Sequence, residues 1–184
     1  MALAKSIRWQ STEHQGLEQL RIDEWPEGIK VRSAIVGQAG DDQHGVFYEV
    51  NLTPDWRFQA ILLQRTDGRV VVLRRGDDGV WLDIDGKALP ELEGCFDIDF
   101  EMTPFTNTLP IRRDPLYIGE TRRFWMAYIP ADTLEVFADE QIYTRLSERE
   151  YRFESGEGDE YFTADIMVDG DGLVVDYPGL FERV

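Results

Sequence analysis

The segment Gly94-Cys-Phe-Asp-Ile-Asp-Phe-Glu-Met-Thr-Pro-Phe-Thr-Asn-Thr-Leu-Pro-Ile-Arg-Arg113 is the stretch from which the rest of the chain can be interpreted. It begins with strict alternation of apolar and acidic residues. Because successive side chains of a strand point to opposite faces, this alternation predicts a strand with one apolar and one acidic face. The apolar face would carry Phe96, Ile98, Phe100 and Met102, and the acidic face would carry Asp97, Asp99 and Glu101.

The second half of the segment is rich in groups that can contact a ligand. Pro104 ends the strand, and Pro110 prevents another ladder of hydrogen bonds. Three short hydrogen-bonding side chains lie between the prolines and two bases follow them: Thr106, Asn107, Thr108, Arg112 and Arg113. We therefore predict the functional site in this segment.

Composition limits the classes of protein that remain. The 184 residues suffice for a single domain over residues 1–184, and 42% of them are hydrophobic, as in a packed globular protein. Acidic residues outnumber basic ones by 36 to 19, which gives a formal net charge of −17. An acidic surface repels nucleic-acid phosphates and anionic membranes, so we expect neither nucleic-acid binding nor stable membrane insertion. The chain starts without an apolar leader, which favours the cytoplasm.

Residues that often carry catalysis give little signal. Cys95 is the one cysteine and starts an apolar-faced strand, so we interpret it as a buried small hydrophobe. The two histidines, His14 and His44, are not spaced as a metal pair. We expect no cofactor and no serine, cysteine or histidine chemistry.

Most other segments show the alternation of strands. Asp67-Gly68 and Asp85-Gly86 are typical of tight hairpin turns. The pattern predicts an all-β, antiparallel sandwich or barrel without a helix longer than two turns. It also predicts a polar connection over residues 37–45 and three separate strands over residues 134–138, 141–146 and 150–154.

Large aromatic residues lie next to bases in several predicted strands. A solvated sheet face would explain this composition, but so would a curved face that binds an amphiphile, because aromatic rings pack on sugars or acyl chains and guanidinium groups bind anions. The pairs are Trp56 with Arg57, Trp125 with Arg123, and Tyr143 with Arg145.

Three interpretations of the central acids and bases stay open. The acids form a satisfied ion-pair network, since buried charge must be paired. Alternatively, Arg112 and Arg113 hold an anionic head group while Thr106, Asn107 and Thr108 bind hydroxyls. In the third interpretation, Asp97 and Asp99 share a strand face and hold Mg²⁺ for phosphoryl hydrolysis.

The motifs of this chain resemble those of the bacterial "putative glycolipid-binding" family, formerly a family of unknown function. The resemblance rests on Cys95-x-Asp97-x-Asp99, Thr103-Pro-x-Thr-Asn-Thr-Leu-Pro-Ile-Arg-Arg113, Tyr48-x-Val50 with Asp55-Trp56-Arg57, Gln141-x-Tyr143, and Asp176-Tyr-Pro-Gly-Leu180. It implies a single incompletely closed, many-stranded β-barrel, similar in architecture to periplasmic lipoprotein carriers. The implied role is to bind a glycolipid or related amphiphile, with no established catalysis.

Together these observations favour a carrier for a glycolipid-like ligand. Its apolar part would contact Trp56, Phe58, Trp125 and Tyr143, and its head group would contact Arg57, Asn107, Arg112 and Arg113. We also expect Asp97, Asp99, Thr106 and Thr108 in the ligand site. The alternatives are a metal-dependent hydrolase of phosphorylated or nucleotide substrates that uses Asp97, Asp99 and Glu101, and a structural interaction module.

Overall fold

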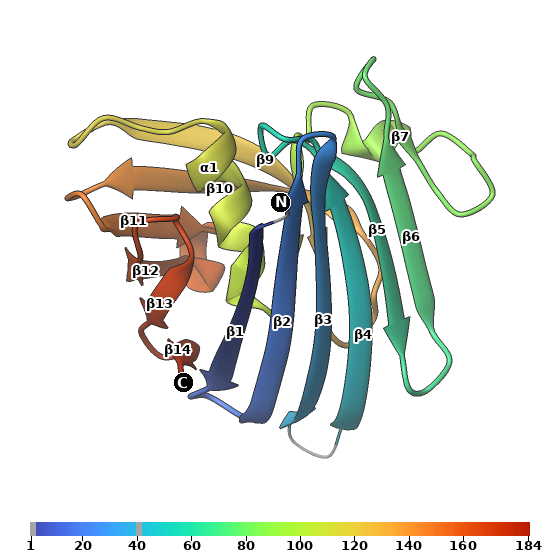
Figure 1. Ribbon diagram of the computed structural model, residues 1–184, viewed down its shortest axis with the longest axis horizontal. Coiled ribbons are helices and arrows are strands. Elements are labelled where there is room, and N and C mark those ends of the chain that lie inside the picture. The colour runs from blue at the N-terminus through green and yellow to red at the C-terminus, as the bar shows by residue number, and fades with distance from the viewer. Residues whose placement is uncertain (1–2, 40–41) are drawn as a thin grey trace.

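The alternating segments pair into one continuous sheet of 14 strands in the computed structural model, which describes residues 3–39 and 42–184 (Figure 1). The strands are β1 (Leu3–Ser11), β2 (Gln15–Trp25), β3 (Gly28–Ala39), β4 (Asp42–Leu52), β5 (Phe58–Arg65), β6 (Val70–Arg75), β7 (Trp81–Leu82), β8 (Asp97–Phe100), β9 (Thr121–Ile129), β10 (Phe137–Arg145), β11 (Glu150–Ser155), β12 (Phe162–Val168), β13 (Val174–Tyr177) and β14 (Phe181–Arg183). The helices are short: η1 (Pro90–Leu92), η2 (Pro104–Asn107), α1 (Thr108–Arg113) and η3 (Gly158–Glu160). The predicted all-β fold is confirmed.

Neighbours in the sheet are also neighbours in the sequence, except at one seam. The strand order is β7-β6-β5-β4-β3-β2-β1-β14-β13-β12-β11-β10-β9-β8, so the first and last strands pair with each other. The two edges, β7 and β8, follow one another in the chain but share no ladder of hydrogen bonds. The sheet is therefore a barrel left open between β7 and β8, which confirms the predicted incomplete closure.

Side chains bridge this gap where backbone pairing stops. The Trp81 indole Nε1 and the Arg75 Nε both donate to the carbonyl oxygen of Cys95, at 3.0 and 3.1 Å. Trp81 also stacks on Phe58, with ring centroids 5.0 Å apart. Cys95 is buried and burial raises the pKa of its thiol to about 11, which fits its interpretation as a packing residue.

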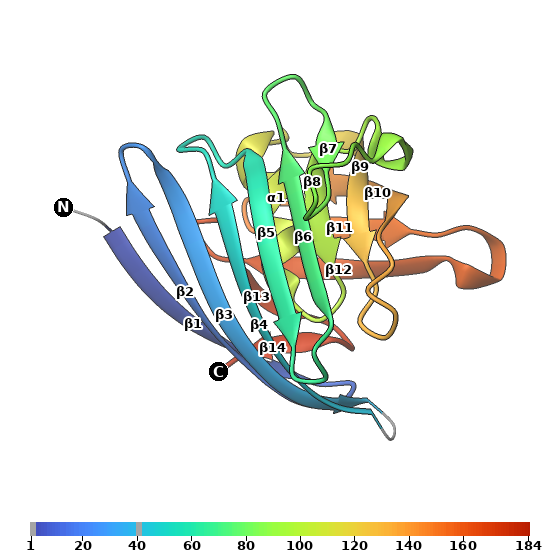
Figure 2. The same cartoon turned by 90° about the vertical axis from the view of Figure 1, so that its right-hand side faces the viewer.

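The prediction of a purely antiparallel sheet needs one correction. Strand β8 pairs with β9 in parallel. Parallel neighbours require a long crossover connection, and here η2 and α1 form it. The central segment of the sequence is thus the crossover between β8 and β9. Figures 1 and 2 both show α1 between the wall of strands β1–β6 and the strands β9–β12.

Several predicted element boundaries were wrong. The alternation predicted a strand over residues 96–102, but only β8 is a strand, and residues 101 and 102 form a turn. Strand β10 is one strand across part of the two segments predicted at residues 134–138 and 141–146. The connection predicted over residues 37–45 is mostly strand, since β3 and β4 extend into it, and residues 40–41 lie outside the described part of the chain.

The interior of the sheet is filled partly by the crossover itself. Residues 103–111, which we call the interior segment, are all buried. Apolar side chains form two core clusters. The first, around Trp9 and Trp81, joins strands β1–β8 to part of β9 and of the interior segment, and the second, around Tyr143 and Phe153, lies mainly among β9–β13. In residues 3–39 and 42–184, no helix has the length and apolarity needed to cross a membrane.

Candidate functional site

One end of the sheet keeps a cavity that the interior segment does not fill. Its volume is about 430 Å³, and it lies near the turn between β1 and β2 and the ends of β3, β8 and β11. Seven aromatic side chains contribute to its walls: Trp9, Phe100, Tyr128, Phe153, Phe162, Tyr177 and Phe181. Five acidic side chains also line it: Glu13, Glu18, Asp99, Glu101 and Asp139. The cavity thus combines aromatic faces with hydrogen-bonding groups.

Asp99 is the centre of the first polar group in this cavity. Strand β8 places its carboxylate against η2 and β10, where Thr106 Oγ1 donates to Oδ1 at 2.7 Å and Gln141 Nε2 donates to Oδ2 at 2.6 Å. Asn107 Nδ2 donates to the Tyr143 hydroxyl oxygen at 2.9 Å, beside this pair. Burial raises the pKa of Asp99, although the two donors to its carboxylate oppose the shift.

Glu18 is the centre of a second polar group in the cavity lining, on β2. The Ser33 hydroxyl from β3 and the Tyr48 hydroxyl from β4 both donate to Oε1 of Glu18, each at 2.6 Å. Thr103 Oγ1 lies 3.2 Å from the Tyr48 hydroxyl oxygen. The same oxygen accepts a hydrogen bond from the Phe105 amide and so caps the start of η2. The second oxygen, Oε2, is buried and has no hydrogen-bond partner in the described structure.

Burial dominates the electrostatics of Glu18. The residue is 3% exposed, and its desolvation raises the pKa to about 7 in spite of the hydroxyl groups that bind its charged form. Glu18 was not among the predicted site residues, although its sequence position carries a signal. Glu18 has the same strand parity as Leu20 and Ile22, so an acid stands on the inward, apolar face of β2.

Four of the eleven predicted ligand residues lie together at the cavity. Asp99 and Asn107 line it, and Thr106 and Tyr143 hold them in place through the hydrogen bonds described above. Thr108 is also in the interior segment but is not a lining residue, and its hydroxyl group is buried without a partner in the described structure. Ligand contact by these residues stays a prediction.

The structure does not bring the predicted arginines into the cavity. Arg113 Nε donates to Oδ2 of the fully buried Asp97 at 2.9 Å. The Arg112 guanidinium lies over the buried Trp56 ring, 4.8 Å from its centroid. Arg57 is exposed and pairs with Asp55 at 2.7 Å.

The remaining aromatic residue of the predicted site is also elsewhere. Trp125 is 47% exposed on β9, where alternating residues Phe124 and Met126 point into the core. Because none of Arg57, Arg112, Arg113, Trp56, Trp125 and Asp97 lines the cavity, the predicted anionic head-group site is not assembled there.

The three acids proposed for a metal site serve separate partners. Asp97 pairs with Arg113, Asp99 accepts from Thr106 and Gln141, and Glu101 accepts from the Ala131 amide at 2.6 Å. Among the residues that the structure describes, no group of three or more His, Cys, Asp or Glu side chains is arranged to hold a metal ion.

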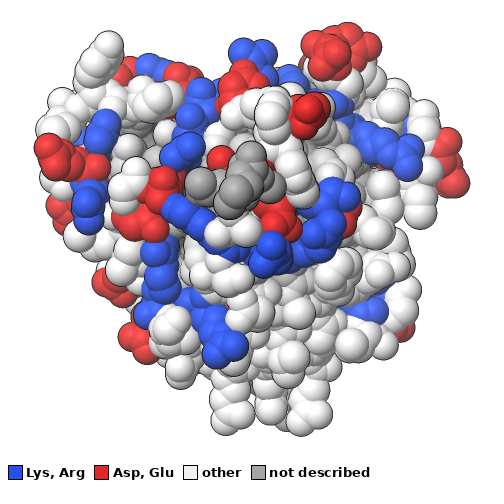
Figure 3. Space-filling view, viewed as in Figure 1, with Lys and Arg blue, Asp and Glu red and all other residues white. Residues whose placement is uncertain are grey.

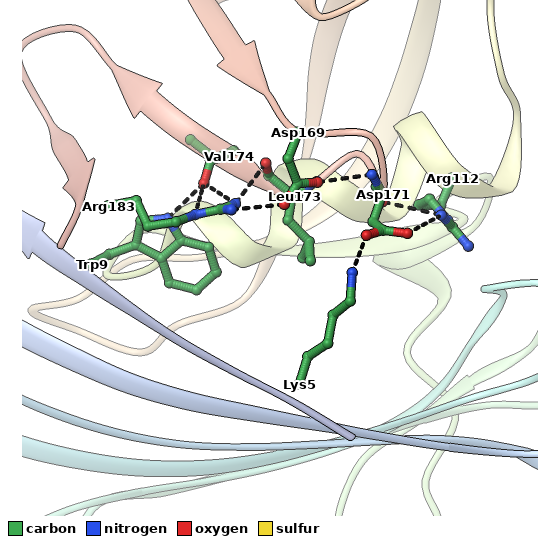
Figure 4. Close-up of polar contacts among 8 residues, drawn as sticks. All are labelled: Lys5, Trp9, Arg112, Asp169, Asp171, Leu173, Val174 and Arg183. Carbon is green, nitrogen blue, oxygen red and sulfur yellow. Dashed lines mark hydrogen bonds and ion pairs between the residues drawn. The ribbon is translucent and has the colours of Figure 1, made fainter. Parts of the chain in front are cut away.

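A third polar cluster lies at the turn between β12 and β13 (Figure 4). Arg183 donates to Asp169 Oδ2 at 2.7 Å and to the Leu173 carbonyl oxygen at 2.8 Å. Lys5 and Arg112 contact Asp171 in the same turn. Bases and acids are intermingled on the face of Figure 3, so these contacts form part of a locally neutralised surface.

Comparison with known proteins gives two matches. The model of the family described as "Putative glycolipid-binding" matches residues 6–183. The fold is similar to the crystal structure of a DUF1089 family protein from Pseudomonas aeruginosa, with 34% sequence identity, a TM-score of 0.79, and coverage of 91% of this chain and 92% of that chain. No curated protein matches the chain.

Proposed function

The chain belongs to the "Putative glycolipid-binding" family, and on this premise we propose that its cavity binds a glycolipid or a related amphiphile. The single observation that carries the proposal is the joint presence of an aromatic wall and a hydrogen-bonding floor in one cavity. Aromatic rings pack against the faces of sugars and against acyl chains, whereas carboxylate and amide groups bind hydroxyls. A volume of about 430 Å³ falls within the range of small-molecule sites.

The floor gives the proposed ligand a defined orientation. Asp99, Asn107 and Gln141 present polar atoms on the interior side of the cavity, and Glu18 does so from β2. Phe153, Phe162 and Phe181 come from β11, β12 and β14, and Phe153 packs next to Tyr143 of β10. We therefore place the polar head near the interior segment and the apolar part among these phenylalanines.

The test is to fill the cavity without changing the rest of the sheet. Ser155 lines the cavity at the end of β11, and Thr163 is exposed on the adjacent β12 outside the lining. We expect Ser155→Trp to abolish binding of octyl β-D-glucoside in titration calorimetry, below the concentration at which it forms micelles, and Thr163→Trp to leave it unchanged. Equal binding by both variants would place the ligand elsewhere.

The same pair of variants tests ligands that the cell supplies. Wild-type protein and Thr163→Trp should retain a co-purifying amphiphile in native mass spectrometry, and Ser155→Trp should not. Co-purification with all three proteins would contradict the cavity as the binding site.

A further inference from the structure

We propose that the cavity selects an uncharged, hydroxyl-bearing head group over an anionic one, and that Oε2 of Glu18 is an acceptor for one of its hydroxyls. This inference rests on the proposed function and specifies the ligand class of the same site. It differs from the head group that the sequence analysis predicted from Arg112 and Arg113.

The charge of the cavity lining favours an uncharged head group over an anionic one. The cavity has five acidic side chains, and no lysine or arginine is among its described lining residues. An anionic head group would have to sit beside carboxylates in a region of low dielectric constant, where like charges repel more strongly than in water. A neutral sugar avoids this repulsion and can donate hydroxyl groups to the same carboxylates.

The basic side chains that could neutralise an anionic head group are already bound to other partners. Arg113 is held by Asp97, and the Arg183 guanidinium is held by Asp169 and by backbone carbonyl oxygens. Arg112 lies over Trp56 and donates to the Asp171 carbonyl oxygen at 3.2 Å. To bind an anion in the cavity, these side chains would have to give up buried or stacked partners.

The geometry of Glu18 presents one of its carboxylate oxygens to a ligand. Ser33 and Tyr48 both donate to Oε1, so the orientation of the carboxylate is fixed by two neighbouring strands. No donor among the described residues lies within hydrogen-bond geometry of Oε2, which is buried on a residue that lines the cavity, although the nearby Thr103 hydroxyl also acts to lower the pKa of this carboxyl. An unpaired buried carboxylate oxygen is costly, and a ligand hydroxyl would satisfy it with a charge-assisted hydrogen bond.

The experiment compares head groups on the same chain length. Octyl β-D-glucoside, octyl phosphate and octyltrimethylammonium are titrated into wild-type protein at pH 8.5, below their micelle-forming concentrations. Burial raises the pKa of Glu18 to about 7, so its carboxyl is largely ionised at this pH. We expect the glucoside to bind at least tenfold more tightly than the phosphate. The ammonium compound, which has no hydroxyl group, reports how strongly the acidic lining attracts a cation.

The variant Glu18→Gln keeps an oxygen for Ser33 and Tyr48 but replaces the acceptor Oε2 by an amide nitrogen that donates. We expect it to weaken glucoside binding about tenfold, as for loss of one charge-assisted hydrogen bond. The matched control is Glu24→Gln, on the same strand but outside the cavity lining, which should bind as wild type does.

The outcomes separate this inference from the proposed function. Binding of octyl phosphate as tight as that of the glucoside would overturn the inference while amphiphile binding stands. Unchanged glucoside affinity in a folded Glu18→Gln would overturn the role of Oε2. If none of the three compounds bound to wild-type protein, the proposed function and the inference would both be wrong. The head-group comparison uses wild-type protein and is independent of how the variants fold.

Discussion

Glu18 places an ionisable group at a position that is only 3% exposed, and this should make stability depend on pH. Its folded-state pKa of about 7 lies above the ordinary value of 4.5, so the folded protein binds this proton more tightly than the unfolded chain. The contribution of Glu18 to the free energy of unfolding therefore falls as pH rises from about 4.5 through about 7.

We expect Glu18→Gln to remove this penalty. Its free energy of unfolding should exceed that of wild type by on the order of 2–3 kcal/mol at pH 8.5, and the two proteins should differ little at pH 4. Urea denaturation at both pH values measures the difference. Parallel pH profiles for wild type and variant would show that Glu18 titrates as an ordinary surface acid. A variant that is more stable but binds more weakly would identify Glu18 as a group kept for function.

The Asp97–Arg113 pair should behave as a structural element and not as part of the cavity. Asp97 is fully buried, and Arg113 supplies its charged partner. Arg113→Met should lower the free energy of unfolding by about 3–5 kcal/mol, because it leaves a buried carboxylate without compensation.

The double variant Asp97→Asn with Arg113→Met should recover a large part of this loss, since neither charge remains. Where these variants fold, their affinity for octyl β-D-glucoside should equal that of wild type. Weaker glucoside binding by the folded double variant would instead support the role that the sequence suggested for Arg113.

Alternation and short polar side chains singled out a segment that contains Asp99 and Asn107, and both residues line the cavity. Their contact with a ligand stays a prediction. Arg112 and Arg113 could not be separated in this way, because consecutive residues of a helix point in different directions and the position of α1 depends on distant strands. Glu18 could have been found, since its parity on β2 places it inward.

At the level of elements, hairpins were predictable and the crossover was not. Asx-Gly turns and alternation of period two are local signals, and they account for the antiparallel pairs. The parallel pairing of β8 with β9 depends on the path of the crossover connection, residues 101–120, through the interior of the sheet. No local sequence signal determines that path. The acidic face of β8 is covered for the same reason, since Arg113 of α1 and Thr106 of η2 pack on it.

The seam between β1 and β14 should be the element most sensitive to Arg183. Only three residue pairs join these strands, and Arg183 ties β14 to the turn between β12 and β13 through Asp169 and two carbonyl oxygens. Arg183→Ala removes these donors at a partly buried site, and we expect it to destabilise β13 and β14 by about 1–3 kcal/mol.

Amide hydrogen exchange tests this expectation. Protection should fall in β13 and β14 and persist in β2 and β3. The matched control is Arg152→Ala, whose ion pair with Asp165 is exposed and should contribute less than about 1 kcal/mol. Equal losses of protection in the two variants would contradict a special role for Arg183.

In the whole molecule, each strand pairs with its neighbours in the sequence, and the first strand pairs with the last. The exception is the pair β7 and β8, which follow one another in the chain but do not pair. Strands β7 and β8 are joined by residues 83–96 yet do not pair, whereas β1 and β14 pair although the chain ends there. The sheet is therefore open where two successive strands are joined by the chain, and it is paired where the first and last strands meet. Hydrogen bonds from Arg75 and Trp81 to Cys95 hold the gap together without any backbone ladder.

A circular permutant tests this description of the architecture. Opening the chain between Asp85 and Gly86 cuts an exposed turn. The old termini would be joined by a Gly/Ser linker of about ten residues, whose root-mean-square reach of about 17 Å matches the roughly five strand residues from Leu3 to Arg8. Arg8 is the residue whose carbonyl oxygen accepts from the Val184 amide at 3.1 Å.

We expect the permutant to fold with the order β8 to β14 followed by β1 to β7, because the cut interrupts none of the 14 strands. The bridge between Leu82 and Ala88 that flanks the cut, and the contacts to Cys95, can form without the covalent link. Its far-UV circular dichroism and its affinity for octyl β-D-glucoside should equal those of wild type. A second permutant, opened between Thr106 and Asn107, cuts the buried interior segment and would place two charged termini beside Asp99. That protein should not fold. If the first permutant failed to fold, the covalent connection between β7 and β8 would be required for the fold. If the second permutant folded, an intact interior segment would not be required to support the cavity.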